Sequence, residues 1–161
     1  SFDLVTCFDV LYHRQVRDEG VALREFWRVL RPGGVLLLRV PAYDWLRGAH
    51  DTAVHTRRRY TRDEVVAAVR AAGFVVAMAT YANCFLFPLA LLKRWSERWR
   101  GAMQEEMRLP PAPLNALLTA VLGAEARLVP YWPLPWGLSV FVLGRKPEAG
   151  GCPASLPVGA P

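Results

Sequence analysis

The stretch FDLVTCFDVLYHRQVRDEGVALREFWRVLRPGGVLLLRVP, residues 2–41, contains two apolar runs separated by a helical pattern. Residues 2–8 and 35–40 have the continuous apolar character of buried parallel strands. Between them, apolar residues from Val21 to Leu30 recur at helical spacing, and Pro-Gly-Gly at 32–34 ends the helix in a tight turn. Two buried strands joined by a helix pair in parallel through a right-handed crossover, so this stretch predicts an α/β fold.

The sequence after this unit predicts a second helix and a third strand. Thr61 and Glu64 form a capping box ahead of a helical pattern that ends at Gly73, and residues 74–81 have strand character. The long segment from Ala42 to Tyr60 has no period and is expected to be a loop at the end of a strand.

The last third of the chain is predicted to be an insertion followed by a final strand. Residues 85–135 contain a helix from Leu86 to Arg100, a short helix from Leu114 to Leu122 and a proline-rich segment. Gly137–Gly144 is predicted to enter the sheet antiparallel. Residues 146–161, which are small and rich in proline, are expected to form a disordered tail.

Composition limits the class of protein. With 161 residues and 53% hydrophobic residues, the chain is expected to form one domain with an ample core. The net charge of +6 is concentrated around residues 57–62 and 93–100, which predicts either an anionic ligand or solvated helix faces. No strand alternates aromatic and basic residues, which argues against a nucleic-acid partner. Three distant cysteines fit neither a metal site nor a disulfide framework and favour a cytoplasmic location.

The first residues of the sequence enter a strand directly. A crossover of two strands would leave a long apolar edge unpaired from Phe2 onward, so we expect the N-terminal half of the domain to be missing from this sequence.

Several motifs resemble the second half of a class I S-adenosylmethionine-dependent methyltransferase of the bacterial small-molecule type. They are Phe2-Asp3-Leu4-Val5 with Asp9-Val10-Leu11-x-His13, Leu23-Arg24-Glu25-x-x-Arg28-Val29-Leu30-Arg31-Pro32-Gly33-Gly34, Leu36-Leu37-Leu38-x-Val40-Pro41-Ala42, and His50-Asp51 with His55, Arg58-Arg59-Tyr60-Thr61 and Ala72-Gly73-Phe74. The resemblance covers about residues 2–145 and implies a Rossmann-like methyltransferase sheet, mostly parallel with an antiparallel last strand. In that sheet, residues 2–8 and 35–40 would be the fourth and fifth strands, and the two later strands the sixth and seventh.

The loops Phe8–His13 and Pro41–Tyr60 follow the ends of parallel strands and are expected to face one cleft, and the resemblance predicts the residues of the site there. S-adenosylmethionine is the implied cofactor, and the residues expected beside it are Phe8, Asp9, Val10, Leu11 and His13. A small-molecule substrate is expected to contact Pro41, Tyr43, His50, Asp51, Arg58, Arg59 and Tyr60. His55 is the candidate catalytic base, because a neutral histidine can accept a proton from a hydroxyl or amine during methyl transfer.

The sequence departs from the family pattern at two places. The glycine-rich cofactor loop and the acidic residue that holds the ribose are not in this sequence, so residues 1–161 alone are expected to bind S-adenosylmethionine poorly or not at all and to be inactive. Tyr12 stands where the family usually has a glutamate. Loss of that carboxylate argues against a metal site, as does the spacing of His50 and His55.

Other interpretations of these residues stay open at this stage. Asp9 can be a turn cap, His13 a loop residue, and the arginines a solvated surface. The chain as a whole can be another nucleotide-dependent α/β enzyme, or a non-catalytic or membrane-associated binding module. In the last case the basic, tryptophan-containing helix Leu86–Arg100 would lie on the inner face of a membrane, whereas in an enzyme it can cover the site. The sequence does not predict an oligomeric state.

Overall fold

The structure is a computed structural model that describes residues 1–161 except 49–50, 52–53, 101–110 and 149–161. Its elements, in chain order, are β1 (Phe2–Phe8), α1 (Glu19–Val29), β2 (Leu30–Pro41), the 3-10 helix η1 (Asp44–Leu46), α3 (Arg62–Ala71), β3 (Val75–Ala82), α4 (Phe87–Arg100), α5 (Ala112–Leu128) and β4 (Ser139–Arg145).

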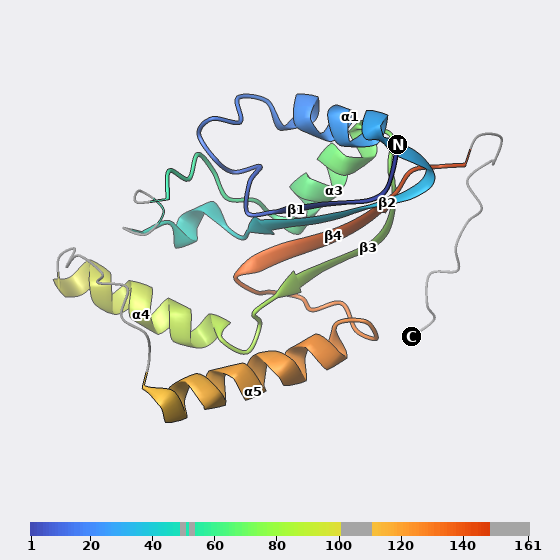
Figure 1. Cartoon of the computed structure of the whole chain (residues 1–161). Coiled ribbons are helices and arrows are strands. Elements are labelled where there is room, and N and C mark those ends of the chain that lie inside the picture. Colours follow the sequence, from blue (N-terminus) through green and yellow to red (C-terminus); the bar gives the residue numbers. More distant parts are fainter. Residues whose placement is uncertain (49–50, 52–53, 101–110, 149–161) are drawn as a thin grey trace.

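The four strands form one sheet in the order β1-β2-β4-β3. β1 and β2 pair in parallel, and β4 lies antiparallel between β2 and β3, so β3 runs in the same direction as β1 and β2. Figure 1 shows this sheet with β1 at one edge and β3 at the other. The predicted α/β crossover and the antiparallel insertion of the last strand are therefore confirmed.

Helices α1 and α3 cover one face of the sheet (Figure 1). Alternate residues of β2, Leu36, Leu38 and Val40, are buried beneath them, as the period of a strand requires. Each helix is capped as its sequence demands: Asp18 accepts from the N–H groups of Gly20 and Val21 at the start of α1, and the predicted capping box of α3 is formed.

The turn at residues 31–34 differs from the prediction. These residues belong to β2 as a bulge, because Phe2 pairs with Leu30 whereas Leu4 already pairs with Val35. Gly33 takes a φ of +76°, and a Cβ on Gly34 would lie 2.8 Å from the carbonyl oxygen of Arg31. The glycines thus allow the chain to pass from α1 directly into the strand, with no separate loop.

Two boundaries near the end of the chain also differ. Helix α5 runs from Ala112 to Leu128, beyond the predicted end at Leu122, because residues 124–128 are good helix formers and Glu125 is anchored. Lys146, which is predicted to begin the tail, is part of the fold instead. Its Nζ donates to the carbonyl oxygens of Trp27 and Leu30, each at 2.7 Å, and lies 3.9 Å from the Trp27 ring centroid. Residues 149–161 of the predicted tail lie outside the described residues.

Candidate functional site

The three strands that run in the same direction each lead into a residue with a left-handed backbone. Asp9 follows β1 with φ of +56°, Tyr43 follows β2 with φ of +54°, and Asn83 follows β3 with φ of +60°. A non-glycine residue in this region costs on the order of 1 kcal/mol, and such residues gather where a side chain is held for function. All three lie at the carboxyl-end edge of the sheet, where α/β folds bind ligands.

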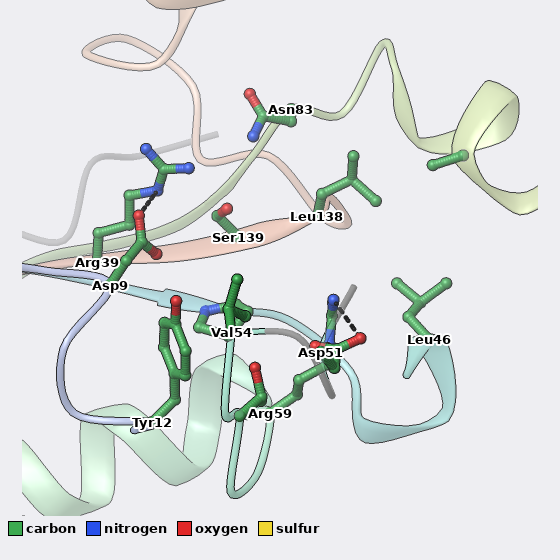
Figure 2. Close-up of a pocket in the computed structure, with 13 residues that line it drawn as sticks. Asp9, Tyr12, Arg39, Leu46, Asp51, Val54, Arg59, Asn83, Leu138 and Ser139 are labelled. Carbon is green, nitrogen blue, oxygen red and sulfur yellow. Dashed lines mark hydrogen bonds and ion pairs between the residues drawn. The ribbon is translucent and has the colours of Figure 1, made fainter. Parts of the chain in front are cut away.

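A cavity of about 360 Å³ opens at this edge (Figure 2). Residues from both predicted loops, from the ends of the strands and from α4 line it: Asp9, Tyr12, Arg39, Pro41, Leu46, Asp51, Val54, Thr56, Arg59, Asn83, Ala90, Leu138 and Ser139. Its volume is within the range of small-molecule sites.

The two predicted loops are joined beside this cavity by backbone hydrogen bonds. The Arg14 N–H donates to the His55 carbonyl at 3.1 Å, and the Arg57 N–H donates to the Tyr12 carbonyl at 2.7 Å. His13 and Thr56 form an isolated antiparallel bridge. The expectation that the loops of residues 8–13 and 41–60 share one cleft is confirmed.

Asp9 and Arg39 form the charged pair of the cavity. Nε of Arg39 lies 3.4 Å from Oδ2 of Asp9, and both side chains are 37% exposed. Figure 2 shows the two side chains facing each other above the end of β2. The Nε atom is buried and makes no hydrogen bond within the described part of the chain, so the pair is held mainly by charge.

Tyr12 presents its phenol to the same cavity (Figure 2). Burial, and then the nearby carboxylates of Asp9 and Asp51, raise the pKa of its hydroxyl above the ordinary value. The hydroxyl is therefore protonated at neutral pH and can donate a hydrogen bond to a bound molecule.

Asp51 and Arg59 are brought together in a buried ion pair that holds the second loop. The Arg59 guanidinium donates to the two carboxylate oxygens at 2.8 and 3.1 Å, and also to the Ala42 carbonyl at 3.1 Å. The Arg59 side chain is only 10% exposed, and the Asp51 side chain only 3%. The pair shapes the wall of the cavity, but Arg59 already binds a protein carboxylate in the manner predicted for a substrate.

Arg58 and Tyr60 face the α1–α3 layer. Arg58 pairs with Glu19 at 3.3 Å and with Glu64 at 3.2 Å, and its guanidinium lies 4.4 Å from the centroid of the Tyr60 ring. The Tyr60 ring is buried, and its hydroxyl donates to the Leu11 carbonyl at 3.4 Å. Neither residue is among those that line the cavity.

His13 and His55 are not among the residues that line the cavity. His55 is exposed, has a φ of +55°, and its ring centroid lies 6.0 Å from that of His13. Nδ1 of His13 accepts from the Gln15 N–H at 3.2 Å. His50 is outside the described residues.

The remaining predicted cofactor residues have different surroundings. Leu11 is a core residue, 3% exposed, whereas Phe8 and Val10 are exposed. The Phe8 ring packs edge-on against that of Phe141, with centroids 6.1 Å apart. Of the five predicted cofactor contacts, Asp9 is the one that lines the cavity.

An aromatic cluster connects the chain after β2 with β3 and α4, and its residues are not among those that line the cavity. The Tyr43 ring stacks on Tyr81 with centroids 5.2 Å apart, and lies 5.5 Å from Trp45 and 5.9 Å from Phe87. Burial, followed by the Tyr81 hydrogen bond, raises the pKa of Tyr43. This cluster explains the conformation of Tyr43, because the left-handed backbone turns its ring onto Tyr81.

Sequence reasoning missed Arg39, Asn83 and Ser139 as cavity residues. Arg39 carried a signal, since a charged residue inside an apolar strand needs a polar environment. Asn83 carried a weaker one, as an asparagine just after a strand favours the left-handed region. Ser139 stands at the start of a strand and had no distinguishing signal.

Glu125 was also missed, and it positions Asn83. Its buried carboxylate, on α5, accepts hydrogen bonds from the backbone N–H groups of Asn83 and, at 3.1 Å, of Phe85. A mid-helix glutamate normally faces water, so the sequence could not indicate this contact.

Comparison with known proteins adds a sequence match to this geometry. A family model described as "Methyltransferase domain" matches residues 1–38, which include β1 and its cavity loop. A search of curated proteins found no match.

Two solved structures show the same fold. Phosphoethanolamine N-methyltransferase 2 of Haemonchus contortus, in complex with S-adenosyl-L-methionine, has a TM-score of 0.51 at 15% identity, over 92% of this chain and 34% of that one. An S-adenosylmethionine-dependent methyltransferase from Mesorhizobium loti also has a TM-score of 0.51 at 15% identity, over 91% of this chain and 62% of that one. The chain thus spans less than two thirds of either structure. By its sheet and by the sequence signature of its first 38 residues, the chain has the class I S-adenosylmethionine-dependent methyltransferase fold.

Proposed function

We propose that this chain forms part of the site of an S-adenosylmethionine-dependent methyltransferase that acts on a small-molecule or lipid-like acceptor. The observation that carries the proposal is that Asp9 and Asn83, two residues with a left-handed backbone that follow strands of the same direction, line one cavity of a class I methyltransferase sheet. The family match to β1 and its loop, and the neighbours that use this cofactor, support the same reaction.

The residues of the cavity fit a cationic methyl donor. The Asp9 carboxylate and the aromatic ring of Tyr12 both line it, and a carboxylate and an aromatic face each stabilise positive charge. When bound, S-adenosylmethionine would supply an electrophilic methyl group for transfer to an oxygen, nitrogen or carbon atom.

The contribution of the protein is alignment. Asp9 and Tyr12 would hold the donor, while Arg39, Asn83 and Ser139 offer polar groups for the acceptor. Displacement requires the acceptor atom and the methyl carbon to lie in line. The ion pair of Asp51 with Arg59 holds part of the cavity wall in place for that alignment.

His55 remains our candidate for a proton acceptor, at the junction of the two cavity loops. It is not one of the residues that line the cavity, so it would receive the proton at the cavity's outer rim. In a preparation that transfers methyl groups, His55→Ala should lower turnover while the affinity for the cofactor stays constant. Equal turnover of variant and parent would remove His55 from the mechanism.

The binding site can be tested by NMR even if the affinity is weak. On titration of the labelled chain with S-adenosylmethionine, the amide signals of Asp9, Tyr12 and Asn83 should shift, and those of Arg24 on the far helix should not. Asp9→Asn should weaken the response about tenfold, because it removes a charge from the cavity. Shifts that avoid the cavity residues would contradict the proposal.

A further inference from the structure

Helix α5 exposes an apolar surface that nothing in the described structure covers. Every residue from Ala112 to Leu128 is exposed apart from Leu118, Val121 and Glu125. Leu114, Leu117, Leu122 and Leu128 are 44, 60, 36 and 45% exposed. These leucines recur at helical spacing on one side of α5, and an exposed apolar stripe of this kind is normally covered, by protein or by lipid.

Exposed apolar residues also lie in the segments before and after α5. On α4 they are Leu89, Leu92 and Trp95, at 58, 61 and 63% exposure, and in the segment after α5 they are Tyr131, Trp132 and Trp136, at 85, 75 and 51%. Together with the four leucines of α5, these residues are called the α4–α5 surface below. Figure 1 shows α4 and α5 on the side of the sheet away from α1 and α3.

From this surface we propose that the protein docks on an anionic lipid bilayer. Tryptophan and tyrosine are the side chains that prefer the boundary between headgroups and hydrocarbon, and three tryptophans and a tyrosine lie among the leucines here. No described helix is long and apolar enough to cross a membrane, so the α4–α5 surface would lie in the interface.

The charges of this region match anionic headgroups. The α4 sequence contains four basic residues and one acidic residue. The single acidic residue of α5, Glu125, is buried against the backbone of Asn83 and Phe85, which leaves α5 with no exposed carboxylate. Basic residues next to interfacial apolar groups strengthen binding to anionic lipid.

A bilayer suits the composition of this surface better than a protein groove does. Tryptophan and tyrosine lie beside the leucines and α5 has no exposed carboxylate, which is the composition of a segment at a membrane interface. The α4–α5 surface also adjoins the cavity, since Ala90 of α4 lines it. If the methyl transfer proposed above is correct, an acceptor that partitions into lipid could enter from this side, but docking itself does not depend on that reaction.

Vesicle flotation tests the docking without cofactor or turnover. The chain should float with vesicles of phosphatidylcholine mixed with phosphatidylglycerol, should float less with phosphatidylcholine alone, and should be released in part by salt. The double variant Leu117→Ser with Trp132→Ser should lower the vesicle partition coefficient at least tenfold, by about the transfer free energy of two large apolar side chains. Both residues are exposed, so circular dichroism of the variant should match that of the parent.

Val21→Ser is the matched control, since Val21 is 55% exposed on α1, across the sheet. It should float as the parent does. Equal flotation with neutral and anionic vesicles, or an equal loss in the Val21 variant, would overturn the proposal. A dimer of the parent chain in sedimentation without vesicles would also overturn the proposal if the double variant were a monomer. A second copy of the chain would then be the occupant of the α4–α5 surface.

Discussion

Arg39 and Asp9 contact each other twice, once through side chains and once through the backbone. The Asp9 N–H donates to the Arg39 carbonyl oxygen at 3.1 Å, while Nε of Arg39 lies 3.4 Å from Oδ2 of Asp9. The backbone bond extends the β1–β2 pairing by one residue, so the register of the two strands determines that these side chains meet. Partner strands thereby place a cation and an anion at the cavity edge.

Asn83 should show opposite effects of glycine and alanine. Because its φ is +60°, Asn83→Gly relieves the backbone and should leave the free energy of unfolding unchanged or raise it by up to about 1 kcal/mol. Asn83→Ala keeps the backbone strain and should lower the free energy of unfolding by about 1 kcal/mol. Both variants remove the amide from the cavity, so both should weaken ligand binding there. Urea denaturation distinguishes them, and equal stability of the two would contradict the left-handed conformation.

Two glycines should respond oppositely to alanine. A Cβ on Gly137 would lie 2.2 Å from the carbonyl oxygen of Ala82, so Gly137→Ala must displace the start of β4 and should lower the free energy of unfolding by about 3 kcal/mol or more. Gly123, within α5, has open space around it, and Gly123→Ala should raise helix stability by about 0.5–1 kcal/mol. Thermal unfolding of the two variants and of the parent tests both predictions. A Gly137 variant as stable as the parent would contradict the close packing of β4 on Ala82.

Glu64 should make the stability of the protein depend on acid pH. The Thr61 backbone N–H, and then the Thr61 hydroxyl and Arg58, hold the pKa of this carboxyl below its ordinary value, even though partial burial opposes them. A lowered folded pKa stabilises the fold above the unfolded pKa of about 4.3, and this contribution is lost as the pH falls through the folded value.

The measurement is the free energy of unfolding of the parent and of Glu64→Gln between about pH 3 and pH 6. Glutamine keeps the capping geometry but does not titrate, so the difference between the two should shrink as the pH falls. A constant difference would show that the charge of Glu64 does not contribute.

The sequence by itself determined the strands, the crossover and the antiparallel last strand, because these follow from apolar periodicity, capping residues and glycines that act over a few positions. It also determined that the loops after β1 and β2 would meet, since parallel strands bring their carboxyl ends to one edge. Asp9 could be predicted on that basis.

The tertiary structure alone decided which polar side chains reach the cavity. Arg58 and Arg59 looked available for a substrate, but the fold gives each an acidic partner, Glu19 with Glu64 and Asp51 respectively, from segments that spacing cannot connect. Arg39 and Asn83 enter the cavity because strand register and the Glu125 contact place them there. Long-range pairing of charges and backbone groups depends on how the elements pack, and a local pattern does not contain that information.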